Sequence, residues 1–183
     1  MDVKKKGGER MEQVVEHLRR ELATIRTGRA SLSLLDGVQV DYYGTQMPLK
    51  QVASLSVPES RTIVIQPWEP NRIPEIEKAI QSANLGLQPS NDGKLIRLNI
   101  PPLTEERRKE YVKLARRMGE EAKVALRNVR RDINDDIKKA QKGGDLSEDA
   151  QRVAQEDIQR STDLYVAKVD DILAKKEAEI LEV

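Results

Sequence analysis

The sequence predicts an α+β protein of two domains: a long antiparallel three-helix bundle and a small α/β-type domain, rich in β-strand, inserted into it. Three segments have apolar residues at the three- and four-residue spacings of amphipathic helices. The segment between the first two instead alternates apolar and polar residues or contains short β-branched runs. The 183 residues suffice for two such domains. We expect residues 1–29 and 104–183 to form the bundle and residues 30–103 the inserted domain, with a hinge at residues 29–31 and 101–104.

The first two helices can be placed from their apolar stripes and their end signals. The first stripe is followed by Gly28, where a helix can end. The second helix follows Pro101-Pro102 and covers residues 104–142, with Thr104 as its N-cap and Gly143-Gly144 after it. No proline interrupts these 39 residues, so they predict a rod of about 58 Å. The two stripes consist of Met11, Val15, Leu18, Leu22 and Ile25, and of Tyr111, Ala115, Met118, Ala122, Ala125, Val129, Ile133 and Ile137.

The third helix completes the bundle. It starts at Asp145 or Ser147, since either side chain can cap it, and its apolar residues again recur at spacings of four and three. Three such stripes bury one another best as an antiparallel bundle. A rod as long as the second helix exceeds what a globular domain of this size needs, so we expect it to project or to span something.

The segment between the first two helices has the pattern of a compact α+β module. Apolar residues alternate before the turn Tyr43-Gly44-Thr45, a β-branched run ends at Pro67, and residues 94–100 alternate again. Residues 74–84 have the spacing of a short helix with proline in its first turn. Two connections join this module to the bundle, and the Pro101-Pro102 pair in one of them favours a restricted hinge over a free tether.

Composition excludes several classes of function. Cysteine is absent and His17 is the only histidine, which excludes disulfides, thiolate catalysis and Cys- or His-rich metal sites. Aromatic residues make up 3% of the chain, too few for a base-stacking surface. No Gly-rich phosphate loop is present, so we expect no bound nucleotide, and we expect no other cofactor and no metal. No apolar run approaches the roughly 18 residues of a membrane span, and no secretory signal is visible, so we expect a cytoplasmic protein without membrane contacts.

Isolated residues that resemble catalytic groups have simpler interpretations. The neighbouring carboxylates Asp135-Asp136 and Asp170-Asp171 point about 100° apart on a helix, so neither forms an acid/base pair. We expect His17 on the surface or boundary of its helix, and Trp68 in the core of the inserted domain or at its boundary.

Charge is distributed unevenly along the chain. Lys and Arg number 32 and Asp and Glu 31, yet residues 104–142 carry a net charge of +5 and residues 143–183 one of −6. At about 100° per residue, the cations of the second helix gather on the side opposite its apolar stripe. We call this set the cationic ridge, on which Glu120 is the exception; its members are Arg116, Lys123, Arg127, Arg130 and Lys138, with Lys113 and Arg131 at one edge.

A rigid rod with such a ridge suits the phosphate backbone of RNA, because one guanidinium can bind two phosphate oxygens. Such contacts position a protein on structured RNA without stacking on its bases. The alternative is a solvated helix face, paired in part with the acidic third helix, which we expect to reach only the flanks of the ridge.

Two classes of function follow from these alternatives: an RNA-docking protein, and a helical adaptor that binds other proteins through its charged faces. If the protein is an adaptor, Arg127→Ala and Arg130→Ala should each be tolerated, with loss only of a protein partner. An enzyme ranks third, because no nucleophile–base constellation is visible.

An ordered set of motifs resembles the bacterial ribosome recycling factor family, from about residue 10 to the end of the chain. Any one motif is weak, whereas the ordered set is very specific. The motifs are Arg26-Thr-Gly-Arg-Ala30, Tyr43-Gly-Thr45 with Pro48-Leu49, Arg61-Thr62, Glu77-Lys-Ala-Ile80, Leu85-Gly-Leu87, Pro101-Pro-Leu-Thr-Glu-Glu-Arg-Arg-Lys109 and Val124-Ala-Leu-Arg-Asn-Val-Arg-Arg-Asp132.

The resemblance implies a molecule shaped like the L of a transfer RNA, with a flexible elbow between bundle and inserted domain. It also implies a function without covalent chemistry: a monomer that binds the large ribosomal subunit and its ribosomal RNA after termination. With elongation factor G and GTP, it splits the ribosome so that messenger RNA and deacylated transfer RNA leave.

The resemblance also assigns residues, by matching position. Arg127 and Arg130 match the central RNA-contacting arginines, with Arg131 beside them. Basic positions near the elbow are matched by Arg26, Arg29 and Arg108. Together with Arg116 and Lys123 of the ridge, these are the expected ribosome-binding residues. The expected hinge consists of Arg29, Ala30, Ser31, Pro101, Pro102, Leu103 and Thr104.

Overall fold

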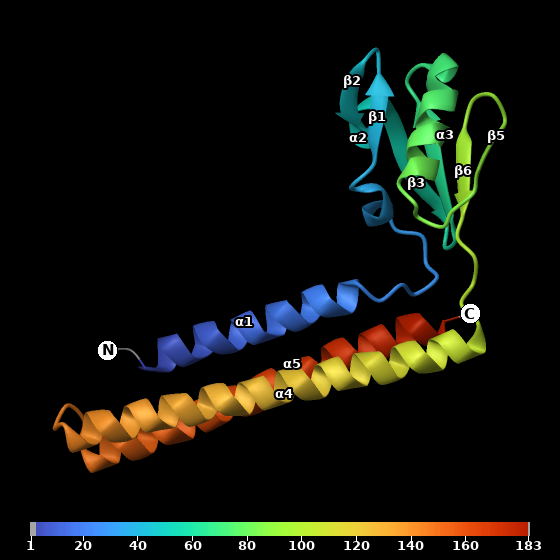
Figure 1. The fold of residues 1–183 in the computed structure, drawn as a ribbon. Helices are drawn as coiled ribbons and strands as arrows, with labels where there is room; N and C mark the ends of the chain where they lie inside the picture. Colours follow the sequence, from blue (N-terminus) through green and yellow to red (C-terminus); the bar gives the residue numbers. More distant parts are fainter. Residues whose placement is uncertain (1–2, 183) are drawn as a thin grey trace. The chain divides into compact units, whose positions relative to one another are not determined.

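The computed structural model describes residues 3–182, which form two compact units (Figure 1). One unit consists of the segments up to Thr27 and from Thr104 onward, and the other is Gly28–Leu103. The first contains three long helices, and the second contains all the strands. Both the long helices and the small sheet domain of the expected fold class are therefore confirmed.

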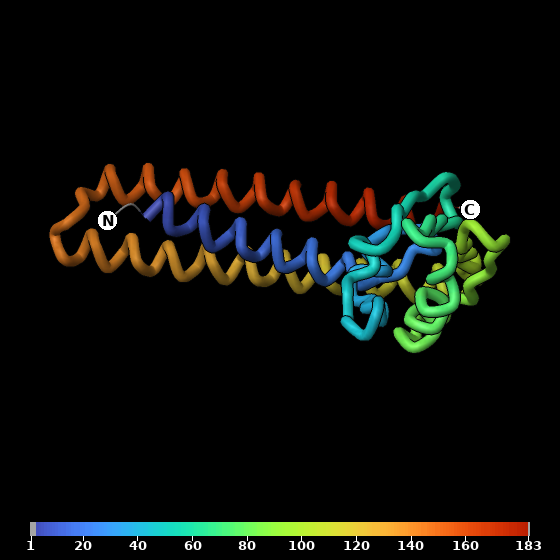
Figure 2. Tube along the Cα trace, turned by 90° about the horizontal axis from the view of Figure 1, so that it is seen from above, coloured from blue at the N-terminus to red at the C-terminus, as the bar shows by residue number. Residues whose placement is uncertain are grey.

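The first unit is a three-helix bundle made of α1 (Val3–Ala23), α4 (Glu105–Lys142) and α5 (Glu148–Leu181). α4 and α5 lie alongside each other for most of their length, the shorter α1 lies along part of both, and α4 runs opposite to the other two (Figures 1 and 2). The apolar stripes meet in one core, whose fully buried members include Met11, Leu126 and Ile133. The 38 residues of α4 make a rod of about 57 Å.

Helix ends follow local capping chemistry. The Thr104 hydroxyl accepts a hydrogen bond from the Arg107 N–H at 3.2 Å, so the predicted N-cap of α4 is confirmed. Ser147 caps α5 in the same way by accepting from the Ala150 N–H at 3.1 Å. The alternative start of this helix at Asp145 is therefore wrong.

Two glycines let the helices of the bundle approach closely. A Cβ atom added at Gly119 of α4 would lie 2.2 Å from Cδ1 of Leu173 in α5. One added at Gly7 of α1 would lie 2.6 Å from Cδ1 of Ile158, also in α5. A side chain at either position would overlap the side chain of Leu173 or Ile158 unless that residue shifted, so glycine permits the close approach seen at both crossings.

Ion pairs join α1 to α4 at the edge of the core. Lys6 Nζ lies 2.8 Å from Asp136 Oδ2, and Arg10 Nη2 lies 2.8 Å from Asp132 Oδ2. The hydrogen bond from Lys6 lowers the pKa of the Asp136 carboxyl below its ordinary value. Because these side chains are partly exposed, each pair stabilises the bundle only modestly.

The second unit packs one short helix and a hairpin with a four-stranded antiparallel sheet. The sheet has the order β3 (Ala53–Glu59), β4 (Thr62–Pro67), β6 (Ile96–Asn99), β5 (Pro89–Asn91). The hairpin is β1 (Gln39–Tyr42) with β2 (Thr45–Pro48), and α3 (Ile73–Ser82) is the helix predicted over residues 74–84. Short elements that are not predicted from the sequence include β5, the 3-10 turn η1 (Leu32–Leu35) and α2 (Leu49–Val52). A second 3-10 turn, η2 (Pro70–Arg72), leads into α3.

A network of polar aromatic contacts fixes the tip of the hairpin. The hydroxyls of Tyr42 and Tyr43 each donate to the Glu69 carboxylate at 2.6 Å, and the Arg72 guanidinium lies 3.7 Å from the centre of the Tyr43 ring. The hydrogen bond to Glu69, with burial and the Glu69 charge, raises the pKa of Tyr42 to about 12. Trp68 directly precedes Glu69 in the sequence, and its side chain is 64% exposed. The expectation that Trp68 lies in the core of the inserted domain or at its boundary is therefore wrong.

Candidate RNA-binding surface

The cationic ridge lies along α4, and its rotation about the helix axis is set by the buried stripe. Ala115, Ala122, Leu126, Val129 and Ile133 turn one side of α4 into the bundle core. The long basic side chains are consequently directed to the other side. On that side, one edge of the ridge lies next to α5. The basic side chains fall into two groups, according to whether a carboxylate of α5 pairs with them.

The first group is neutralised by α5. Arg116 Nε and Nη2 donate to the two carboxylate oxygens of Glu177 at 2.7 and 3.2 Å, which raises the pKa of Arg116. Lys123 Nζ lies 2.6 Å from Asp170 Oδ1 and 3.4 Å from Glu120 Oε1. Only 16% of the Lys123 side chain is exposed, and the hydrogen bond to Asp170 raises its pKa.

The expectation that the acidic helix reaches only the flanks of the ridge is therefore wrong for Arg116 and Lys123. Both are held by carboxylates of α5, which offset their positive charge and so weaken the attraction that a phosphate would experience at either one. Their role as RNA contacts stays a prediction.

The second group is not neutralised. Arg127, Arg131 and Lys138 are exposed, and none of them forms an ion pair or hydrogen bond with another residue in the described range 3–182. With Arg130, these side chains line a hollow of about 320 Å³ on the surface of α4. Its remaining lining residues are Asn128, Asn134 and Asp135. Four cations and one carboxylate give this hollow a net positive charge, which attracts an anion.

Arg130 has an uncharged partner. Its Nη1 donates to Oε1 of Gln159 in α5 at 2.9 Å, and Nε2 of the same glutamine donates to Asp163 Oδ1 at 2.9 Å. The half-buried Arg130 is thus held by an amide, and its charge is not paired directly.

One polar atom in the hollow has no partner within the chain. Oδ1 of Asn134 is buried and accepts no hydrogen bond from the described residues. An unpaired buried acceptor is costly, but this oxygen is shielded from solvent, so a ligand in the hollow reaches it only if neighbouring side chains move.

The three arginines expected near the elbow belong to different units. Arg26 follows α1 and Arg108 lies in the first turn of α4, so both belong to the bundle unit. Arg29 belongs to the inserted unit, because the boundary falls between Thr27 and Gly28. Arg26 and Arg29 are exposed, whereas Nε of the half-buried Arg108 is buried without a hydrogen-bond partner among the described residues.

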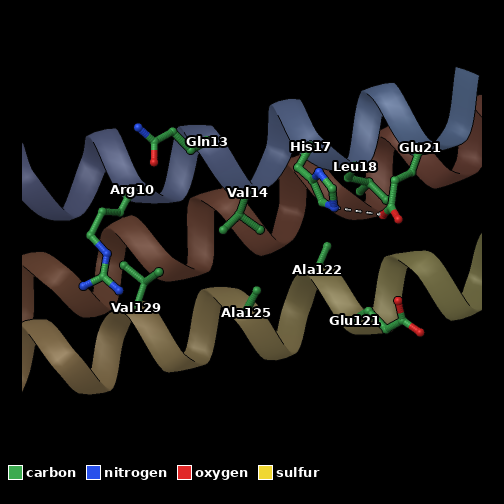
Figure 3. A pocket seen from close by; sticks show the side chains of 10 residues that line it. All are labelled: Arg10, Gln13, Val14, His17, Leu18, Glu21, Glu121, Ala122, Ala125 and Val129. Carbon is green, nitrogen blue, oxygen red and sulfur yellow. Dashed lines mark ion pairs between the residues drawn. The ribbon is translucent and has the colours of Figure 1, made fainter.

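A second hollow of about 480 Å³ lies between α1 and α4 (Figure 3). Its floor is apolar and built from small side chains, while charged residues stand at its rim. His17 is at this rim, 70% exposed, with Nε2 3.6 Å from Glu21 Oε2, which confirms its expected surface position. The hollow gathers no set of groups suited to catalysis, and no cluster of three or more metal-ligating side chains occurs among residues 3–182. No helix in that range is long and apolar enough to cross a membrane.

Fold and charge together define the class of protein: a two-domain α+β protein whose longest helix carries an unneutralised cationic hollow. The sequence matches the family model described as ribosome recycling factor over residues 18–181. The chain therefore belongs to the ribosome recycling factor family.

Individual relatives agree over nearly the whole chain. The ribosome-recycling factor of Nitratidesulfovibrio vulgaris strain DP4 is 59% identical over 175 residues, which are 96% of this chain and 94% of that protein. That of Bacillus mycoides strain KBAB4 is 58% identical over 181 residues, or 99% and 98%.

Solved structures give the same result. A solution structure of a ribosome recycling factor superposes with a TM-score of 0.73 at 42% identity, covering 100% of this chain and 97% of that one. A Thermus thermophilus ribosome recycling factor, placed with Escherichia coli elongation factor G on the E. coli post-termination complex, gives a TM-score of 0.61 at 45% identity. That comparison covers 99% of this chain and 98% of the other.

Proposed function

We propose that this protein recycles ribosomes. It binds the ribosome after termination and, with elongation factor G and GTP, separates the subunits so that messenger RNA and deacylated transfer RNA are released. The observation that carries the proposal is family membership over nearly the full chain, with relatives at 57–59% identity. The relative placed with elongation factor G on a post-termination complex supports the choice of partner.

The bundle docks on ribosomal RNA of the large subunit through α4. The unneutralised cations Arg127, Arg130 and Arg131 supply the contacts, because guanidinium groups bind phosphate oxygens with directed hydrogen bonds. Phosphate contacts of this kind fix position and orientation without reading sequence, which suits docking at one place on a folded RNA. Arg26 and Arg108, at the end of the bundle where α4 begins, extend the contact, and Arg29 adds to it from the inserted unit.

The protein itself performs no covalent chemistry. GTP hydrolysis belongs to elongation factor G, and this chain acts as a monomeric, cytoplasmic lever. The rod-like α4, about 57 Å long without an internal proline, carries force from the translocase to the subunit interface.

Sedimentation of purified post-termination ribosomes tests this function directly. Free subunits should appear when the protein, elongation factor G and GTP are all present, and omission of any one should leave the intact ribosome as the main peak. An unchanged intact peak with all three components, in the presence of demonstrably active elongation factor G, would contradict the proposal.

The inserted domain moves about a double hinge at residues 29–31 and 101–104. Two features support this: only two connections join the units, and they lie side by side where a Cβ at Gly28 would be 3.5 Å from the Leu103 backbone nitrogen. Gly28 has φ +75°, a backbone conformation that other residues rarely adopt, so the first connection requires glycine at this position. Pro101-Pro102 stiffens the second connection, because proline fixes φ.

Replacing Pro101 and Pro102 by glycine should therefore slow splitting while large-subunit binding stays within about twofold of wild type. Glycine makes the connection a flexible tether, and a flexible tether transmits less force between the units. Binding to isolated large subunits and the rate of subunit separation are measured side by side. Splitting at the wild-type rate by the double glycine variant would show that a stiff second connection is not needed.

A further inference from the structure

The three cations of α4 that reach α5 meet chemically different partners. Arg116 is held by the Glu177 carboxylate and Lys123 by the Asp170 carboxylate, whereas Arg130 is held by the Gln159 amide. α5 is rich in acids, so an amide at this position is a distinctive choice. Of the three basic residues, Arg130 alone lines the hollow on α4.

The orientation of the glutamine amide is determined by its second contact. The Asp163 carboxylate can only accept hydrogen bonds, so at 2.9 Å it requires the NH₂ group of Gln159. The amide oxygen is thereby directed to Nη1 of Arg130, also at 2.9 Å. Gln159 and Asp163 are four residues apart on α5, a spacing that places both on the same helix face.

We infer that Gln159 is a positioning residue for RNA docking, oriented by Asp163, which holds the Arg130 guanidinium toward the hollow without neutralising it. The inference rests on the proposed function, in which Arg130 contacts ribosomal RNA.

One amide contact leaves most of the guanidinium available. Arginine has five N–H donors, and the Gln159 oxygen accepts from Nη1 alone. The remaining donors can bind phosphate, and the partly ordered side chain loses less conformational entropy on binding than a freely rotating one. A carboxylate at the position of the amide would compete with phosphate for the same charge, as Glu177 does at Arg116.

A charge-neutral exchange separates this role from a general electrostatic effect. Gln159→Glu combined with Asp163→Asn moves the carboxylate by one helical turn, onto Arg130, and leaves the net charge of the protein unchanged. The amide introduced at position 163 can still donate to the carboxylate introduced at position 159, so the contact within α5 is kept. Equal far-UV circular dichroism and equal thermal midpoints confirm that the exchanged protein folds as the wild type does.

The measurement is the affinity for isolated large ribosomal subunits across a salt series. The exchange should weaken binding by about three- to tenfold near 0.1 M salt and lower the slope of log K against log salt by about one, as loss of one phosphate contact does. Gln159→Ala should weaken binding only about two- to threefold at unchanged slope, because the charge remains while its positioning is lost. In an Arg130→Ala background the exchange should have no further effect.

Wild-type affinity and slope in the exchanged protein would overturn the inference, and so would an equal effect of the exchange with and without Arg130. Arg130→Ala with unchanged affinity and slope would instead contradict docking through Arg130, and the inference with it. Failure of the proposed function is thus distinguished from failure of the positioning role.

Discussion

Alanine at Gly119 is expected to lower the free energy of unfolding of the bundle by about 2 kcal/mol, although alanine is the better helix former. The new Cβ would lie 2.2 Å from Cδ1 and 2.9 Å from Cγ of Leu173. Both distances are far below van der Waals contact, so α5 must shift or Leu173 must leave its rotamer. Overpacking of this kind typically costs about 1–3 kcal/mol, which exceeds the gain in helix propensity of about 1 kcal/mol.

Gly8 provides the matched control for this substitution. It also lies within a helix, α1, but a Cβ added there has no atom within 4 Å. Gly8→Ala should therefore raise the free energy of unfolding by up to about 1 kcal/mol. Urea unfolding followed by circular dichroism at 222 nm measures both variants. Stabilisation by Gly119→Ala equal to that by Gly8→Ala would show that the helices are not in close contact at this crossing.

Removal of two exposed arginines, Arg127→Ala with Arg131→Ala, is expected to weaken binding to isolated large ribosomal subunits by about 10- to 100-fold near 0.1 M salt. Neither side chain is paired with a described residue, so the substitutions break no internal hydrogen bond or ion pair. Stability should remain within about 0.5 kcal/mol of wild type, as is usual at such surface positions. The loss then reports on binding alone.

A control of equal charge is available on α5. Arg152 and Arg160 are both exposed, and Arg152→Ala with Arg160→Ala lowers the net charge by the same two units. Because these residues lie outside the hollow on α4, binding should weaken by less than about threefold, through general electrostatics alone. Equal losses in the two double variants would indicate that net charge, and not the hollow, determines affinity.

The sequence is sufficient to predict the long elements of this fold, because each is specified locally. The buried stripe of α4 and its Thr104 cap follow from periodicity and from one hydroxyl, and both are observed. The short strand β5 (Pro89–Asn91) could not be predicted, because proline, serine and asparagine do not favour strands, and pairing with β6 outweighs that preference. The position of Trp68 likewise depends on tertiary packing, and its flanking prolines gave no signal of exposure.

The candidate site shows the same division between local and tertiary information. Helical angles alone place seven cations on one side of α4, but they contain no information on where α5 lies against that side. The position of α5 decides that Glu177 and Asp170 neutralise Arg116 and Lys123 while Arg127 and Arg131 stay unpaired. Gln159 has no signal in the sequence, because an exposed glutamine on a polar helix face is ordinary until its contact with Arg130 is seen.

The salt dependence of large-subunit binding tests the central claim most directly, which is that unpaired guanidinium groups on α4 bind RNA phosphates. The wild-type protein and the Arg127→Ala/Arg131→Ala variant are compared from about 50 to 200 mM salt, a range over which phosphate contacts weaken strongly. The account predicts a linear fall of log K with log salt for both proteins, with the slope of the variant shallower by about two. Parallel lines with equal slopes would contradict it.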